Sequence, residues 1–209
     1  MKLKYFGHAC FALQLEDVTL VIDPFDESVR YAPCTQSCDV ALVSHDHFDH
    51  NHTASLTGNF VTIAAAGSYQ QGKVHITALP CYHDKRQGAL RGKNLVFIME
   101  GEGLHIAHLG DLGHMPDEAL AQSLKDLDLM LIPIGGTYTI DTPEAEELIH
   151  RLNPRCAVAM HYRTEDYDCD MATCAAFEAD MKAVRMPREL EICRESLDRL
   201  PGIMIMNYK

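Results

Sequence analysis

Short runs of apolar and β-branched residues dominate the first half of the chain. Residues 2–6, 10–15 and 18–23 form three such runs, separated by Gly7–His8 and Glu16–Asp17. Short runs bounded by turn residues predict an antiparallel meander of strands. Further strands are expected at residues 39–44, 59–64, 73–79, 94–100, 104–109, 128–134, 156–160 and 203–206.

Helical patterns alternate with the later strands. Proline and acidic residues open the segments 116–124 and 142–152, as is typical of a first helical turn. A third helix is expected over 170–183, with Asp170 as its cap, and a more charged one over 188–199. Strands followed by this alternation predict an α/β fold with two sheets and helices packed outside them. No linker or low-complexity segment divides the chain, so one domain over 1–209 is expected.

Composition and charge narrow the classes of partner. Lys and Arg total 18 against 30 for Asp and Glu, which gives a formal net charge of −12. Nucleic-acid binding relies on clustered basic charge, so a nucleic-acid partner is not expected. A small anionic substrate stays compatible, because bound cations can reverse the local field. The start of the chain does not resemble a signal peptide and the longest apolar runs are too short to cross a bilayer, so we expect a cytoplasmic protein without a membrane partner. The sequence leaves homo-oligomerisation open.

The stretch VSHDHFDHNH at 43–52 holds four of the twelve histidines and follows a strand of the buried type. His45 and His47 are two residues apart as the strand ends, so their side chains point the same way and can bind one metal ion. Asp49 and His50 follow as the chain turns, and they project toward a neighbouring position. Nitrogen and carboxylate donors suit Zn²⁺, Fe²⁺ or Mn²⁺. A solvated histidine-rich turn is the alternative, against which the preceding strand and the HxHxDH order argue.

SHDHFDH closely resembles the signature of the metallo-β-lactamase superfamily. The order of the other motifs also fits along essentially the whole chain: the early Asp23 in VTLVIDP, and then His83 in LPCYHD, Asp111 in AHLGD and His161 in AVAMHY. The motif order is nearest to the compact hydrolases related to ascorbate-6-phosphate lactonase and to the phospholipase D that acts on N-acyl-phosphatidylethanolamines. The resemblance implies a four-layer αββα sandwich, with two mixed β-sheets flanked by helices.

The same resemblance implies a dinuclear metal centre, with two Zn²⁺ ions expected first and Mn²⁺ or Fe²⁺ as alternatives. Two neighbouring cations lower the pKa of a shared water, which gives a bridging hydroxide that attacks a carbonyl or phosphorus centre. Asp49 is expected to accept the proton of this nucleophile as well as to bind metal. His8 is a further catalytic candidate, as a contact to substrate or to a ligand. The implied ligand set is His45, His47 and His83 on one metal, Asp49, His50 and His161 on the other, and Asp111 between them.

Two loops are candidates for substrate contacts. The loop 83–94 is glycine-rich and basic within an acidic protein, so Arg86 and Arg91 are expected to hold a phosphate or carboxylate of the substrate. A solvated hairpin loop is the alternative. Thr137 and Tyr138 follow a buried-type strand and are expected to form another wall of the pocket.

Together these features predict a metal-dependent hydrolase that cleaves a small ester, lactone or phosphodiester. A metal-dependent sensor of the same fold without turnover is the non-enzymatic alternative. A nuclease of this fold is opposed by the charge of −12. Di-iron redox chemistry with a flavin is opposed by the lack of a second domain to hold the flavin.

Overall fold

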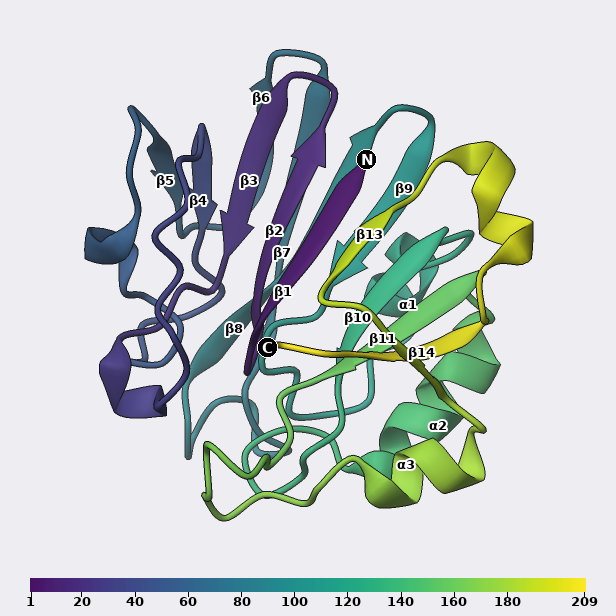
Figure 1. Ribbon diagram of the computed structural model, residues 1–209. Coiled ribbons are helices and arrows are strands. Elements are labelled where there is room, and N and C mark those ends of the chain that lie inside the picture. Colours follow the sequence, from purple (N-terminus) through teal and green to yellow (C-terminus); the bar gives the residue numbers. More distant parts are fainter.

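The computed structural model describes all 209 residues, and its strands form two sheets packed face to face (Figure 1). The six-stranded sheet has the order β13-β1-β2-β3-β4-β5 and the eight-stranded sheet the order β12-β14-β11-β10-β9-β8-β7-β6. The six-stranded sheet consists of β1 (Lys2–Gly7), β2 (Cys10–Leu15), β3 (Val18–Ile22), β4 (Val40–Leu42), β5 (Val61–Ile63) and β13 (Glu189–Glu191). The eight-stranded sheet consists of β6 (Gly67–Gln71), β7 (Val74–Tyr82), β8 (Lys93–Gly101), β9 (Leu104–His108), β10 (Leu129–Pro133), β11 (Cys156–Met160), β12 (Val184–Met186) and β14 (Ile203–Met206).

The main hydrophobic core lies between the two sheets. Leu13 and Leu20 of the first sheet and Phe97 and Ile106 of the second belong to one cluster of 29 buried residues. Side chains alternate between the two faces of a strand, so each strand contributes every second residue to this core. Burying this apolar surface provides most of the free energy that holds the sheets together.

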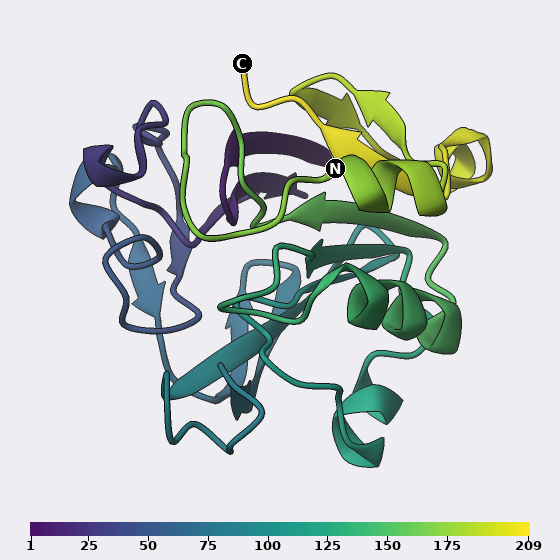
Figure 2. The ribbon, with the colours of Figure 1, turned by 90° about the horizontal axis from the view of Figure 1, so that it is seen from below.

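Three helices cover the outer face of the eight-stranded sheet (Figure 2). They are α1 (Glu118–Ser123), α2 (Thr142–Leu152) and α3 (Ala175–Asp180). The Asp141 carboxylate and Glu144 form a capping box at the start of α2, and Asn153 ends it in the left-handed conformation. The sequence-based predictions for the first two helices are therefore confirmed.

A long loop covers the outer face of the six-stranded sheet. Phe25, Val29 and Tyr31 of this loop pack on outward-facing residues such as Ala12 and Val21 in a separate cluster of buried residues. The loop contains the 3₁₀ helix η1 (Glu27–Val29), capped by the Asp26 carboxylate. The sandwich of two mixed sheets is confirmed, and its α-helices are few and lie on one sheet.

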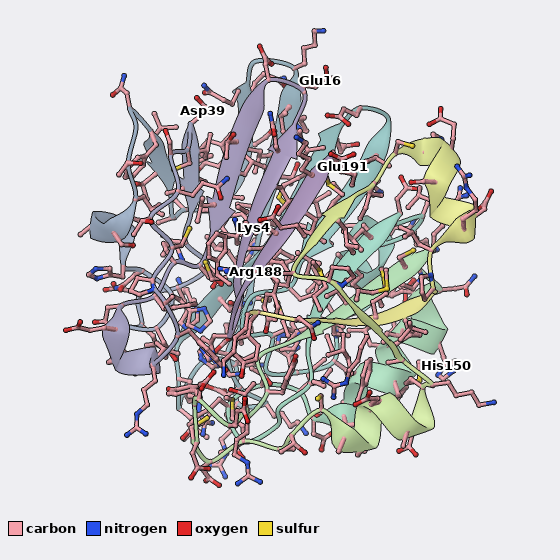
Figure 3. All side chains as sticks on the ribbon, in the orientation of Figure 1. Lys4, Glu16, Asp39, His150, Arg188 and Glu191 are labelled. Carbon is pink, nitrogen blue, oxygen red and sulfur yellow. The ribbon has the colours of Figure 1, made fainter.

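Two predicted helices differ from the structure. The helix expected over 170–183 is limited to α3, because the preceding residues run beside the β10 end, where the Ala172 N–H donates to the Gly135 carbonyl. The helix expected over 188–199 is wrong: its first part is strand β13 and its second the 3₁₀ helix η3 (Arg194–Arg199). β13 pairs with β1, and Figure 3 labels Lys4 of β1 and Glu191 of β13. Across the pair, Nζ of Lys4 lies 2.6 Å from Oε1 of Glu189. Tertiary pairing thus overrides the local helical preference.

The strand directions bring several strand ends to one edge of the sandwich. β9, β10 and β11 are mutually parallel in one sheet, and β3 and β4 are parallel in the other. Parallel strands end at the same edge of a sheet, so the residues that follow these strands come together there. The 3₁₀ helix η2 (Thr53–Ser55) closes the loop that leaves β4. None of the α-helices is both long and apolar enough to cross a lipid bilayer.

Candidate metal centre

The Asp111 carboxylate lies at the centre of the residues gathered at this edge. Its Oδ2 is 3.0 Å from Nε2 of His161 and 3.1 Å from Nε2 of His83. The same oxygen is 3.4 Å from Nε2 of His50 and 3.9 Å from Nε2 of His45. Four histidines from three strand ends, those of β4, β7 and β11, therefore converge on one buried carboxylate.

The donor atoms around Asp111 fall into groups within which all of them lie no more than 4.8 Å apart. The first group is His45, His47 and His83, and the second is His8, Asp49, His50 and His161. A third, overlapping group joins His45, His50 and Asp111. The first two groups contain the residues of the two sets implied by the sequence resemblance. His8 is the addition: its Nε2 lies 3.1 Å from Oδ2 of Asp49.

In three of these imidazoles, a protein oxygen lies within hydrogen-bond distance of Nδ1, the nitrogen that points away from Asp111. Nδ1 of His50 lies 3.0 Å from Oδ2 of Asp23, and Nδ1 of His83 lies 3.0 Å from the Tyr138 carbonyl oxygen. Nδ1 of His45 lies 2.9 Å from Oγ of Ser44. Each contact turns Nε2 of its ring toward the centre, which is how orienting partners prepare histidines for a metal ion.

Several buried donor atoms at the centre have no hydrogen-bond partner in the protein. They are Nε2 of His45, Nε2 of His50, Nδ1 of His8, Nδ1 of His161 and Oδ1 of Asp111. Leaving buried polar atoms without partners costs free energy, so such a concentration indicates a ligand. Imidazole nitrogens and carboxylate oxygens are the donors that zinc and similar divalent ions take, and the site therefore fits metal ions.

Burial and neighbouring charges shift the pKa values of the cluster in opposite directions. Burial lowers the pKa of His45 to about 3, so this imidazole is neutral at pH 7. Burial also disfavours charge on His50, but the carboxylates of Asp111 and Asp23 outweigh it and raise the pKa of His50 well above its usual value. Burial opposes the charge of Asp111 too, yet His161 and His50 hold its pKa well below the usual range.

Three residues of the cluster have left-handed backbone conformations, which side-chain-bearing residues rarely adopt. The φ angles are 54° for His8, 48° for Asp23 and 53° for His161. The His161 N–H donates to the His8 carbonyl over 2.8 Å and links the two sheets beside the centre. Nε2 of His108, three residues before Asp111, lies 2.8 Å from the Ala9 carbonyl oxygen. Strained backbone of this kind is typical of functional sites.

A pocket of about 520 Å³ opens above the cluster. Of the four residues predicted to contact substrate, Arg91 and Tyr138 line this pocket, whereas Arg86 and Thr137 are exposed and do not. The complete lining is His8, Asp46, His47, Phe48, Asp49, His83, Arg91, Asp111, Tyr138, His161, Tyr167, Cys169 and Met171. Tyr167 was missed because the residues directly after β11 have no regular periodicity that would show which side chains turn inward, and Met171 was missed because it was assigned to the helix expected over 170–183.

Asp84 is a further residue that sequence reasoning missed. Its buried carboxylate accepts four backbone N–H groups of the following loop, from Arg86 (2.7 Å), Gly88 (3.0 Å), Leu90 (2.9 Å) and Arg91 (2.8 Å). Burial raises its pKa, but these hydrogen bonds outweigh that effect and lower the pKa to about 2. An Asp directly before a glycine-containing loop was the available signal, since Asp side chains favour such loop-closing bonds.

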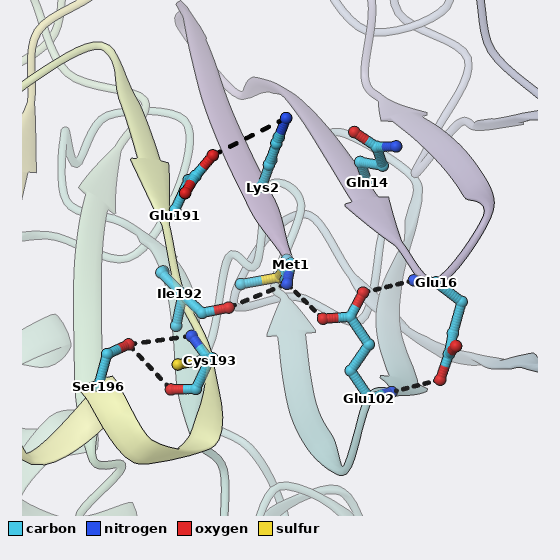
Figure 4. Close-up of a pocket in the computed structure, with 9 residues that line it drawn as sticks. All are labelled: Met1, Lys2, Gln14, Glu16, Glu102, Glu191, Ile192, Cys193 and Ser196. Atoms are coloured by element: carbon cyan, nitrogen blue, oxygen red, sulfur yellow. Dashed lines mark hydrogen bonds and ion pairs between the residues drawn. The ribbon is translucent and has the colours of Figure 1, made fainter.

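A separate hollow of about 460 Å³ lies beside the start of β1 and the end of β2 (Figure 4). Oε1 of Glu102 accepts the Glu16 N–H over 2.6 Å, and Oε1 of Glu16 accepts the Glu102 N–H over 3.3 Å. The Met1 amino group donates to Glu102 and to the Ile192 carbonyl. These polar groups satisfy one another, and none of the predicted site residues lines this hollow.

Known proteins share both the sequence and the fold of this chain. Residues 2–161 match the family model of the β-lactamase superfamily domain. A UPF0173 metal-dependent hydrolase of Carboxydothermus hydrogenoformans is 28% identical over 193 residues, with 78% of this chain and 85% of that protein covered.

Solved structures extend this comparison. A Thermotoga maritima protein assigned as a zinc-dependent hydrolase of the metallo-β-lactamase superfamily is 34% identical, with a TM-score of 0.82 over 98% of this chain and 97% of that one. The di-iron β-hydroxylase CmlA of Streptomyces venezuelae is 13% identical, with a TM-score of 0.66 over 99% of this chain and 52% of that one, and shares the fold alone. The chain belongs to the metallo-β-lactamase superfamily, and within it is a metal-dependent hydrolase.

Proposed function

We propose that the chain binds two divalent metal ions, zinc first among them, and hydrolyses a small ester, lactone or phosphodiester. The observation that carries the proposal is the convergence of two donor groups on Asp111, with unpartnered buried atoms in both. In this proposal His45, His47 and His83 hold one ion, and Asp49, His50 and His161 hold the other. Asp111 then lies between the two ions.

When bound, a pair of divalent ions ionises water near neutral pH and polarises the electrophilic oxygen of a substrate. The protein residues position the reactants around this centre. Asp49 lines the pocket, and its pKa is held low by the His8 hydrogen bond and the His50 charge although burial opposes them. A carboxylate that stays ionised can accept a proton from the attacking water, and His8 keeps this carboxylate oriented.

Three observations support the substrate class. The motif order resembles a branch of the superfamily that acts on a lactone and on a phosphodiester. The pocket of about 520 Å³ suits a small molecule. The net charge of −12 and the single Arg or Lys in the pocket lining favour a small molecule over nucleic acid.

Metal content measured by mass spectrometry, on the parent and on an Asp111→Ala variant, tests the proposal. We expect about two metal ions per parent chain and a clear loss in the variant. Turnover of lactones and of bis-p-nitrophenyl phosphate, with the bound ion supplied, then tests hydrolysis. One ion or none after reconstitution, together with an unchanged Asp111→Ala variant, would contradict the dinuclear proposal. Two ions without turnover of any lactone or phosphodiester would favour a sensor.

A further inference from the structure

Arg91 is the only Arg or Lys among the residues that line the pocket above the metal-type cluster. Its guanidinium has no ion-pair or hydrogen-bond partner in the protein, although most other arginines of the chain pair with acids or carbonyls. It lies with Cζ 5.3 Å from the centre of the Tyr138 ring. A guanidinium that lies over an aromatic ring keeps the N–H groups in its own plane free for an anion.

Two contacts fix the position of Arg91 relative to the metal-binding candidates. Its backbone N–H donates to Asp84, the residue directly after His83. Its side chain packs on Tyr138, whose carbonyl oxygen lies 3.0 Å from Nδ1 of His83. The loop is also fastened by the His83 N–H, which donates to the Gly92 carbonyl. The guanidinium is thus placed by the same contacts that orient His83.

Arg91 stands where two hollows meet. The pocket above the cluster and an adjacent hollow of about 550 Å³ share Asp46, His47 and Arg91 in their linings. Lys93 also lines the adjacent hollow and has no ion-pair partner. Asp46 is the one carboxylate at the junction, and its Oδ1 accepts a hydrogen bond from Nδ2 of Asn51 over 2.6 Å. Arg91 and Lys93 therefore bring two unpaired positive charges to these hollows, against the one carboxylate at their junction.

From this geometry we infer that Arg91 is the specificity-determining residue for an anionic group on the substrate, a carboxylate or a phosphate separate from the bond that is cleaved. The inference rests on the proposed function, because the scissile group occupies the metal centre while the second anionic group reaches Arg91. Arginine binds both anions through paired N–H donors. Arg86, predicted from the sequence for the same role, lies outside both hollows.

Isothermal titration of the metal-loaded protein tests the inference without turnover. The probes are acetate, which carries one carboxylate, and malonate, succinate and glutarate, which carry two at increasing separation. We expect at least one dicarboxylate to bind tenfold or more tightly than acetate, a gain of about 1.4 kcal/mol. The gain should disappear in Arg91→Gln, recover in part in Arg91→Lys and persist in Arg86→Gln, a matched change in the same loop.

A comparison of a phosphonate with a dicarboxylate identifies the preferred anion. If 3-phosphonopropionate shows a larger Arg91-dependent gain than succinate, the group recognised is a phosphate, and the reverse result indicates a carboxylate. The inference is overturned if no dicarboxylate gains over acetate, if Arg91→Gln keeps the gain, or if Arg86→Gln loses it equally. Metal content, measured on every variant, shows whether a lost gain comes from loss of the metal ions. If the Arg91-dependent gain is intact but no hydrolysis is found, only the hydrolytic proposal is contradicted.

Discussion

The carboxylate of Asp23 joins Ser44 to His50. It accepts hydrogen bonds from the Ser44 N–H (2.8 Å) and hydroxyl (2.7 Å), and its Oδ2 lies 3.0 Å from Nδ1 of His50. Asp23 follows β3 directly and is fully buried. One side chain at the end of a strand therefore fixes both the start of the histidine-rich loop and the ring orientation of a proposed ligand.

The Asp23→Asn variant should weaken metal binding while the protein stays folded. In the variant, the amide nitrogen at position 23 replaces one of the two carboxylate oxygens that accept from Ser44 and contact Nδ1 of His50. A donor would then face a donor, and the His50 ring would lose its fixed orientation. Partners of this kind change metal affinity by about ten- to a hundredfold. Competition with a chromophoric chelator would measure the loss, and Asp17→Asn in the exposed β2–β3 turn is the matched control. An unchanged affinity would show that Asp23 has only a structural role.

Most of the sandwich and of the cluster could be predicted from the sequence, because both depend on local patterns. Buried-type strands show as short apolar runs, and a strand followed at once by HxHxDH or by a single Asp or His places these side chains at a strand end. The positions of Asp111 and His161 were predicted by resemblance, and the structure brings both beside the histidine-rich loop.

What could not be predicted depends on contacts between distant segments. Residues 189–191 form a strand only because β1 offers them a free edge, and no local signal reports that partner. Likewise Arg86 and Arg91 were indistinguishable in the sequence, since both are arginines of one basic loop. Only the loop path set by the Asp84 carboxylate directs Arg91 to the pocket and leaves Arg86 in solvent.

The metal-free protein should lose stability as the pH rises above about 6.5. Although burial opposes it, the Asp111 and Asp23 carboxylates raise the pKa of His50, so the folded state binds a proton that the unfolded chain releases near its ordinary pKa. This stabilisation is fully present below the pKa that His50 has in the unfolded chain. It is lost as the pH rises through the higher pKa that His50 has in the folded protein. The slope should approach 1.4 kcal/mol per pH unit, at about its maximum for one proton.

Urea unfolding in the presence of EDTA, from pH 6 to pH 9, would measure this slope. The His50→Gln variant cannot titrate at this position and should show a smaller dependence on pH over the same interval. Equal slopes for the parent and the variant would contradict the assignment of the proton to His50.

Replacing Asp84 by Asn should destabilise the protein, and most of all the loop that follows it, because the backbone N–H groups held by Asp84 lose acceptors. Two of the four backbone N–H groups would lose an acceptor and face the amide N–H₂ instead, so the loop from residue 85 to 91 would open. The stabilisation by the ionised Asp84 is present above the unfolded pKa of about 4 and is lost as the pH falls through about 2. Urea unfolding at pH 7 and the rate of proteolysis in this loop would measure the change. Asp126→Asn in an exposed turn is the control, and a loop cleaved no faster than in the parent would contradict the role of Asp84.

Gly113→Ala should impair the first donor group by moving His83. A Cβ at Gly113 would lie 2.2 Å from the His83 carbonyl carbon and 2.3 Å from the Asp84 nitrogen, which are backbone atoms that no side-chain rotation can clear. The Gly113 N–H also donates to the Tyr82 carbonyl, so the two segments cannot separate without losing that bond. Metal affinity should therefore fall in addition to the free energy of unfolding.

Two further variants separate a local displacement from general destabilisation. Gly202→Ala adds the same methyl group with its nearest neighbour 3.8 Å away, and it should change neither metal affinity nor stability appreciably. Gly135→Ala places a Cβ 2.2 Å from the His161 carbonyl oxygen and should disturb the second donor group instead. Spectroscopic titration with Co²⁺ in place of zinc would then show a different ion weakened in each variant. If both variants lost the two ions together, the groups would act as one coupled unit through Asp111, because neither ion would be held without its neighbour.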